Sequence, residues 1–272
     1  MTTARPWPVL RAPAHWLAVD FISDLHLQPG EPGTVEAWQR YMASTPANAV
    51  FILGDLFEVW VGDDAVADHP TTDDQNPGFE SRCVEVLHAA SQRLDVYLMH
   101  GNRDFLMGPA LMARCSAHML NDPTTLAFAG QRWLLTHGDA LCLGDTDYMK
   151  FRAQVRSDAW QKAFLAKPLE ERKAIARDLR SQSEARKSGS SKEDYADVDA
   201  TTAASWLRSA EAKTMIHGHT HKPANHDLGA GLQRIVLSDW DTLANPPRAE
   251  VLRLSMDPAA PIHRLPLQSA IA

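Results

Sequence analysis

The sequence predicts an α/β fold with four layers, an α/β/β/α sandwich, and three observations support this prediction. Apolar runs typical of buried strands alternate with helical patterns over the first hundred residues. Four further apolar runs add strands with shorter connections, which suggests two sheets covered by helices. A basic helical stretch interrupts this second series, and we expect it to be an insertion into the sandwich.

The first part of the chain predicts a β-α-β alternation. Residues 16–22, 49–53 and 95–99 are short apolar runs, which we predict to be buried strands. Residues 35–43 and 80–93 have apolar positions at helical spacing, so we predict a helix in each connection. Such alternation builds a sheet with helices packed on its face.

Four later apolar runs predict further strands, at residues 132–136, 213–216, 234–238 and 250–254. With 272 residues, 44% of them hydrophobic, the chain can bury one sizeable core. We therefore predict a single domain over residues 1–272, with the helical insertion at about 147–192.

The insertion carries a charge opposite to that of the whole chain. Residues 147–192 contain 12 Lys and Arg against 6 Asp and Glu, whereas the chain has a net charge of −7. Apolar residues recur at helical spacing up to about residue 187, so the segment can form either a lid over a site or an ordinary hairpin with a solvated basic face. Residues 181–192 have the composition of a flexible connection.

Bulk composition argues against several classes of protein. A net charge of −7 does not suggest a general nucleic-acid-binding surface. Cys83, Cys115 and Cys142 are odd in number and lack Cys-x-x-Cys spacing, which argues against a disulfide framework or a zinc knuckle. No window approaches the ~20 apolar residues of a membrane span, and the N-terminus lacks the apolar run of a secretory signal. We expect a cytoplasmic protein.

Five short polar segments each follow an apolar run, and together they predict the functional site. They are Asp24-Leu25-His26, Gly54-Asp55, Gly101-Asn102-Arg103-Asp104, His137-Gly138-Asp139 and His217-Gly218-His219-Thr220-His221. Each segment alone is ordinary turn chemistry, but open α/β sheets place ligands at the carboxyl ends of their strands. Five such segments therefore indicate one shared site.

Seven residues in these segments have side chains that divalent metals prefer, namely Asp24, His26, Asp55, Asn102, His137, His219 and His221. A bridged pair of ions needs about eight donor positions with one shared, and Asp55 is the natural bridge. Side-chain direction repeats every two residues along an extended backbone, so we expect Asp24 and His26 to face one metal region together. The same expectation holds for His219 and His221.

A two-metal site predicts hydrolysis of a phosphoester or phosphoanhydride, because two ions about 3.5 to 4 Å apart activate a water and neutralise phosphoryl charge. Arg103, directly after Asn102, can clasp phosphate oxygens. The alternative for Arg103 is an ion pair with Asp104. Other residues beside the ligands are expected to orient them, and these are His100, His217 and Asp139. We expect the acidic residues 63–78 to be a solvated loop rather than a further metal site.

The ligand segments resemble those of the calcineurin-like metallophosphoesterases. In that group the position of Arg103 is usually a histidine, which can protonate a poor leaving group. An arginine does not readily do so, whereas a phosphate leaving group needs little protonation. The arginine therefore favours a diphosphate substrate over an alkyl phosphodiester.

The resemblance narrows to the UDP-2,3-diacylglucosamine diphosphatase family of lipid A biosynthesis over about residues 19–240. The motifs that carry it lie at residues 21–27, 52–58, 100–106 and 216–221, and Asn102-Arg103-Asp104-Phe105 is the most specific. It implies hydrolysis of UDP-2,3-diacylglucosamine to UMP and 2,3-diacylglucosamine 1-phosphate with two divalent ions, usually manganese. It also implies peripheral attachment to the cytoplasmic face of the inner membrane of a Gram-negative bacterium, with acyl chains housed by the lid.

The resemblance assigns roles to single residues as well. It implies one metal held by Asp24, His26, Asp55 and His221, and another held by Asp55, Asn102, His137 and His219. Arg103 and Asp55 are implied to act in catalysis. The implied substrate contacts are Asn102, Arg103, Asp145, Ser183, Lys192 and His219.

Two alternatives stay open on the sequence. One is an enzyme of the same fold that hydrolyses a soluble nucleotide diphosphate or dinucleoside polyphosphate and needs only a polar pocket. The other is a metallophosphoesterase-like scaffold without turnover, but such proteins generally lose ligands, whereas all seven are present here. Neither a nucleic acid nor an obligate protein partner is expected.

Overall fold

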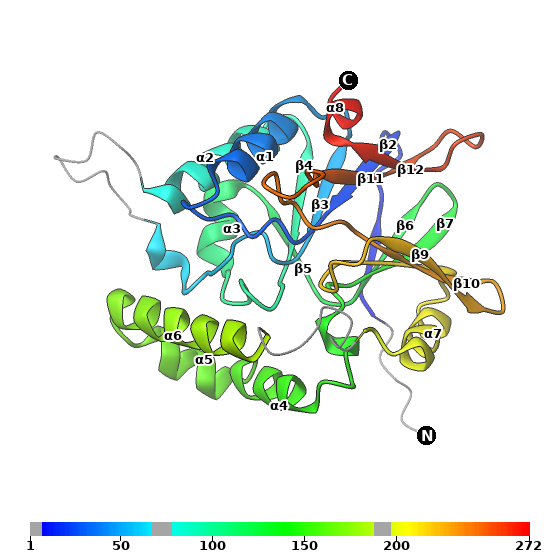
Figure 1. Cartoon of the computed structure of the whole chain (residues 1–272). Helices are drawn as coiled ribbons and strands as arrows, with labels where there is room; N and C mark the ends of the chain where they lie inside the picture. The colour runs from blue at the N-terminus through cyan, green and yellow to red at the C-terminus, as the bar shows by residue number, and fades with distance from the viewer. Residues whose placement is uncertain (1–6, 67–77, 188–196) are drawn as a thin grey trace.

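Two six-stranded sheets pack face to face and helices cover their outer faces (Figure 1). The structure is a computed structural model, and it describes residues 7–66, 78–187 and 197–272. The arrangement confirms the predicted α/β sandwich.

The first sheet contains the strands of the predicted β-α-β alternation. Its order is β12-β11-β2-β3-β4-β5, and β2 to β5 run parallel. The bounds are β2 Ala18–Ile22, β3 Ala49–Leu53, β4 Asp95–Met99, β5 His118–Leu120, β11 Glu250–Ser255 and β12 Ile262–Pro266. Ile22 pairs with Ile52, and Ile52 pairs with Leu98. The loops that follow β2, β3 and β4 therefore leave the sheet at the same edge.

The second sheet has the order β1-β6-β7-β8-β10-β9. Its strands are β1 Val9–Arg11, β6 Thr124–Phe128, β7 Gln131–Leu135, β8 Thr214–His217, β9 Ala224–Gly229 and β10 Leu232–Val236. Strands β7 and β8 run parallel, with Leu135 opposite Ile216. Their carboxyl ends therefore also lie together, and the last two polar segments begin there.

The helices are α1 Pro32–Ser44, α2 Phe79–Ser91, α3 Pro109–Cys115, α4 Thr146–Val155, α5 Asp158–Leu165, α6 Leu169–Lys187, α7 Ala200–Ser209 and α8 Leu267–Ala270, with single 3-10 turns at Asp63–Ala65 and Asp139–Leu141. Helices α1, α2 and α3 pack against the first sheet, and α7 packs against the second. Proline in the first turn of α1 suits a helix start, because that position needs no backbone donor.

An aromatic stack fills the space between the sheets. Phe21 and Tyr97 stack on opposite sides of Phe51, with ring centroids 5.0 and 4.7 Å away. Trp16 meets Phe51 edge-on at 6.0 Å. Aromatic pairs in such offset and edge geometries add stability beyond their buried area, so this stack holds together the strands from which the site loops leave.

Helices α4, α5 and α6 form a layer of their own beside the sandwich (Figure 1). Trp160 and Phe164 of α5 stack at 4.7 Å, and Trp160 lies 6.1 Å from Phe105, which follows the third polar segment. Phe164 is only 6% exposed within the core of the first sheet. The insertion is therefore docked on the core. Helix α6 continues to Lys187, so the expected flexible connection at 181–192 is helical in its first part.

Two residues at the start of the acidic loop, Asp63 and Asp64, make contacts with helices. Asp63 accepts the backbone N–H groups of Gly108 and Leu111, both at 2.9 Å, at the first turn of α3. Asp64 pairs with Arg172 of α6. The expectation of a solvated loop was therefore wrong for Asp63, whereas Asp64 stays exposed as expected although it pairs with Arg172. Residues 67–77 lie outside the described part.

Arg172 fastens α6 to this loop. Its side chain is 2% exposed and donates to the carbonyl of Lys167 at 2.9 Å, the carbonyl of Val61 at 2.5 Å and the Asp64 carboxylate at 2.9 Å. We expect Arg172→Ala to lower the free energy of unfolding by about 2 kcal/mol, since it strands buried carbonyls that each cost about 1–3 kcal/mol when unsatisfied. Urea titration measures the change.

A matched control lies on the same helix. Lys173 pairs with Glu170 on the surface, so Lys173→Ala should cost about 0.5 kcal/mol or less. Equal unfolding free energies for the two variants would contradict the role given to Arg172.

Candidate metal centre

The five polar segments follow β2, β3, β4, β7 and β8 and bring their side chains into one cluster. Two groups of ligand atoms each lie within 4.8 Å of one another, one made by Asp24, His26 and His221 and the other by Asp24, Asp55 and His137. Asp55 Oδ2 lies 3.8 Å from His26 Nε2 and 3.8 Å from His137 Nε2. Asp24 belongs to both groups, and Asp55, a member of the second group, also contacts His26 of the first.

Asn102 and His219 complete the second group. Asn102 Oδ1 lies 3.1 Å from His137 Nε2 and 2.8 Å from His219 Nδ1. All seven predicted ligands are therefore connected through contacts shorter than 4 Å. The sequence placed these residues at strand ends, and the structure brings them together.

The backbone at the ligands differs from the extended chain that we expected. Asp24, His26, Asp55, His219 and His221 all have left-handed φ angles, between 49° and 68°. Such angles cost non-glycine residues free energy, and they concentrate at functional sites. The five ligands thus lie in tight turns after the strands.

These turns decide which histidines share a group. Asp24 and His26 converge, as predicted, but His219 and His221 separate. His221 Nε2 lies 3.3 Å from Asp24 Oδ1, whereas His219 contacts Asn102. The prediction that both histidines face one metal region was wrong. The alternation of an extended chain does not apply to these left-handed residues, and Asp24 and His26 converge although their backbone is left-handed as well.

Hydrogen bonds between loops hold the ligands in these positions. The Asp24 carboxylate accepts the backbone N–H of His219 at 2.9 Å, and Asp55 Oδ1 accepts the backbone N–H of Arg103 at 2.9 Å. Asp104 is fully buried and accepts the N–H groups of Gly101 and Leu56, both at 2.8 Å. Asp104 is therefore a loop brace rather than an ion-pair partner of Arg103.

Gly101 leaves room for the Asp55 carboxylate. A Cβ atom at position 101 would overlap Asp55 Oδ1, and it would also meet the Asp55 backbone nitrogen. We expect Gly101→Ala to weaken manganese binding by about 10-fold or more, because residues that orient ligands matter by about 10–100-fold. Isothermal titration with manganese measures this. Gly30→Ala, whose Cβ would meet nothing within 4 Å, is the control, and equal affinities would refute the packing role of Gly101.

The imidazoles present their acceptor nitrogens to the cluster. His137 Nδ1 lies 2.9 Å from the carbonyl oxygen of Leu53, which can only accept, so the neutral ring carries its proton on Nδ1 and offers its Nε2 lone pair to a cation. His26 Nδ1 lies 2.9 Å from the Glu58 carboxylate, and its Nε2 faces the cluster in the same way. Neutral imidazoles with outer partners of this kind are typical metal ligands.

Buried negative charge dominates the cluster. Burial opposes protonation of His137, yet the carboxylates of Asp55 and Asp24 prevail and raise its pKa to about 9. Burial and the charge of His137 lower the pKa of His219 to about 4. Burial and Asp55 raise the pKa of Asp104 to about 6. Carboxylates that raise the pKa values of buried neighbouring groups create an environment that favours a cation. The oxygen and nitrogen donors of this cluster suit hard or borderline divalent ions.

Further residues around the cluster connect it to the insertion. Asp139 is fully buried and accepts from Tyr148 and Arg152 of α4, both at 2.7 Å. The Tyr148 ring lies 6.0 Å from that of His219. Arg156 donates to the carbonyl of Gly101 at 2.8 Å. Arginines that sequence analysis placed on a basic segment therefore brace the loops that carry the ligands.

The two remaining histidines beside the ligands have backbone contacts. His217 Nδ1 lies 2.8 Å from the carbonyl oxygen of Gly218, and His100 Nε2 lies 2.7 Å from that of Met107. They stabilise the loops rather than meeting the ligand side chains. Glu58 and Tyr148 were not among the predicted site residues, although Glu58 is the last residue of the motif at 52–58.

The predicted substrate contacts lie in different surroundings. Arg103 Nη1 is 3.3 Å from Glu58 Oε1, at the rim of the cluster. Asp145 is exposed and caps α4 by accepting the N–H of Tyr148 at 2.9 Å. Ser183 belongs to the end of α6, where only the backbone is described, and Lys192 lies outside the described residues.

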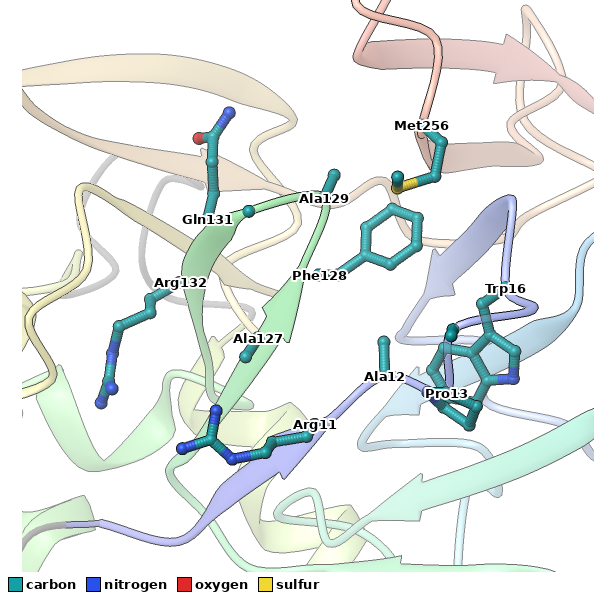
Figure 2. A pocket seen from close by; sticks show the side chains of 12 residues that line it. Arg11, Ala12, Pro13, Trp16, Ala127, Phe128, Ala129, Gln131, Arg132 and Met256 are labelled. Atoms are coloured by element: carbon teal, nitrogen blue, oxygen red, sulfur yellow. The ribbon is translucent and has the colours of Figure 1, made fainter.

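A separate cavity of about 420 Å³ lies at the other end of the second sheet (Figure 2). Arg11, Phe128, Arg132 and Met256 are among the residues that line it. It borders the turn before β7, whereas His137 follows the end of β7. None of the seven predicted ligands lines it, so we assign it no part in the chemistry.

A family model and similar proteins of known name point to the same family. A family model described as calcineurin-like phosphoesterase matches residues 17–223. A protein of Chromobacterium violaceum named UDP-2,3-diacylglucosamine hydrolase is 44% identical over 231 residues, which is 82% of this chain and 91% of that protein. Proteins of the same name from Bordetella pertussis and Marinobacter nauticus are each 40% identical, over 89% and 81% of this chain and 92% and 88% of their own.

Proposed function

Because this chain belongs to the UDP-2,3-diacylglucosamine hydrolases of the calcineurin-like phosphoesterase family, we propose that it hydrolyses the pyrophosphate bond of UDP-2,3-diacylglucosamine. The products are UMP and 2,3-diacylglucosamine 1-phosphate, a step of lipid A biosynthesis. The observation that carries the proposal is the convergence of all seven predicted ligand side chains, with Asp55 in contact with a histidine of each group and Arg103 at the rim.

The proposed cofactor is a pair of divalent ions, with manganese as the natural candidate for this mixed carboxylate and imidazole set. When bound, such a pair supplies an activated water and neutralises phosphoryl charge. Asp24, His26, Asp55 and His221 would hold one ion, and Asp55, Asn102, His137 and His219 the other. The Nδ1 partners of His26 and His137 keep the Nε2 atoms of both rings available to the ions.

Arg103 is the proposed catalytic residue beside Asp55. Its guanidinium can take two phosphate oxygens at once and stays charged at every working pH. Arg103 does not supply a proton, and a phosphate leaving group needs little protonation. Arg103 would therefore stabilise charge on the diphosphate rather than act as an acid. The other proposed substrate contacts are Asn102, Asp145, Ser183, Lys192 and His219.

We further propose that the insertion at about 147–192 is a lid for the acyl chains, within one domain that spans the chain. Phe151, Leu165 and Leu179 keep 39%, 42% and 37% of their surface exposed, which is apolar area suited to a lipid. No helix in the described ranges is long and apolar enough to cross a membrane. The proposed attachment is therefore peripheral, at the cytoplasmic face of the inner membrane, where the lipid substrate resides.

Product identification tests the proposal. Incubation with UDP-2,3-diacylglucosamine and manganese should release UMP and the lipid monophosphate, and soluble dinucleoside polyphosphates should be poor substrates. Preferred turnover of the soluble compounds would instead favour a nucleotide hydrolase of the same fold. No turnover of either substrate class in a protein that binds manganese would favour a scaffold.

A further inference from the structure

Glu58 is a buried carboxylate that has no part in the function proposed above. It is 7% exposed and lies three residues after Asp55. Its backbone N–H donates to the carbonyl of Leu27 at 3.2 Å, and Leu27 forms an isolated β-bridge with Phe57. The backbone of Glu58 is therefore fixed beside the loop that carries His26.

The two oxygens of Glu58 face different parts of the protein. Oε2 lies 2.9 Å from His26 Nδ1, on the side of the ring away from the cluster. Oε1 lies 3.3 Å from Arg103 Nη1 and 3.3 Å from Arg180 Nη1, and Arg180 belongs to α6 of the insertion. One carboxylate thus contacts a metal ligand, the proposed catalytic arginine and the insertion.

This position requires a carboxylate. An ionised carboxylate accepts on both oxygens, so it can take the Nδ1–H of His26 and two guanidinium groups together. A glutamine has one accepting and one donating end. If its oxygen faces the arginines, its NH₂ donates to His26 Nδ1 and shifts the ring proton to Nε2. A protonated Nε2 has no lone pair with which to bind a metal. If its oxygen faces His26, its NH₂ meets two cations that can only donate.

We propose that Glu58 is a positioning residue that couples the metal centre to the insertion. Through Oε2 it orients His26 with the Nε2 lone pair toward the metal. Through Oε1 it holds Arg103 and Arg180 side by side, so that docking of α6 and placement of Arg103 depend on one another. The coupling to Arg103 rests on the proposed function, whereas the orientation of His26 does not.

Manganese titration without substrate tests the His26 part. Glu58→Gln should lower manganese affinity by about 10–100-fold, as expected for loss of an outer partner of a ligating histidine. Glu250→Gln, which removes a carboxylate paired with Arg264 in β12, is the matched control and should keep wild-type affinity. Wild-type affinity in the folded Glu58→Gln variant would overturn this part whatever the substrate proves to be.

A double-mutant cycle tests the coupling at saturating manganese. Glu58→Gln and Arg180→Ala should each raise KM for the diacyl substrate by about tenfold. The KM of the double variant should be higher than that of Arg180→Ala by only about twofold or less, because the effects of contacting residues are not additive. The loss of manganese affinity should persist in the Arg180→Ala background. Independent, multiplicative effects on KM would overturn the coupling.

A second substitution guards against misfolding of Glu58→Gln. Glu58→Asp keeps both accepting oxygens but has a side chain shorter by one methylene. We therefore expect a smaller loss of manganese affinity and a smaller rise in KM than in Glu58→Gln. Thermal denaturation shows whether each variant is folded. The proposal would be refuted if Glu58→Asp kept both the manganese affinity and the KM of the wild type and Arg180→Ala kept the wild-type KM.

Discussion

Replacing Asp24 with alanine is expected to abolish hydrolysis, with a loss of about 10³-fold or more, because metal ions supply several kcal/mol of charge stabilisation and each 1.36 kcal/mol is tenfold in rate. The Asp24 carboxylate belongs to both groups of converging ligand atoms, and it also accepts the backbone N–H of His219. Its loss should therefore disturb both ions. Steady-state turnover and bound manganese per chain, measured by mass spectrometry, record the effect.

Two further variants bracket this result. Asn102→Ala should lose activity to a similar extent, because Asn102 Oδ1 lies between His137 and His219. Asp257→Ala removes an exposed carboxylate from the turn after β11 and should retain activity. Full turnover by either Asp24→Ala or Asn102→Ala would refute the metal-centred account.

Arg103→Ala should lower turnover by about 10²–10³-fold, the usual cost of losing one donor that stabilises transition-state charge. Its manganese content should stay near that of the wild type, because the Arg103 side chain contacts Glu58, and the backbone N–H that Arg103 donates to Asp55 is kept in the alanine variant. Turnover at saturating manganese and the metal content of the same sample give the comparison.

A conservative substitution of Arg103 distinguishes two-point phosphate binding from a structural role. Arg103→Lys keeps the charge but loses the planar fork, so its activity should fall between that of Arg103→Ala and that of the wild type. Parallel loss of metal in Arg103→Ala would show instead that Arg103 supports the metal centre.

The sequence predicted the buried strands well because their signal is local. The runs at 49–53 and 95–99 are strands with the expected ends, since continuous apolar residues flanked by polar ones define a buried strand. Strand β9, Ala224–Gly229, alternates between partly buried and exposed residues and depends on its pairing with β10. Tertiary pairing of this kind leaves little local signal.

That the seven predicted ligand side chains gather in one place was predictable, but the geometry of their backbone was not. Residue types and places after strands were sufficient to select the seven side chains. The left-handed turns at residues such as His219 and His221 arise from contacts between loops, such as the N–H of His219 on Asp24. No spacing rule for extended chain foresees them.

The roles of charged residues outside the motifs depended most on the fold. The sequence allowed the basic residues of the insertion a solvated face, but Arg156 and Arg172 donate to main-chain carbonyls of the core. Glu58 and Arg180 are 122 residues apart in the sequence and meet only because α6 returns to the site. Such pairs have no signature in a single sequence.

Anomalous diffraction from crystals soaked in manganese tests the central claim most directly. We expect two manganese peaks about 3.5 to 4 Å apart, with the Asp55 carboxylate between them and Asp24 and Asn102 beside different ions. A single peak, or none, with the seven side chains dispersed would contradict it.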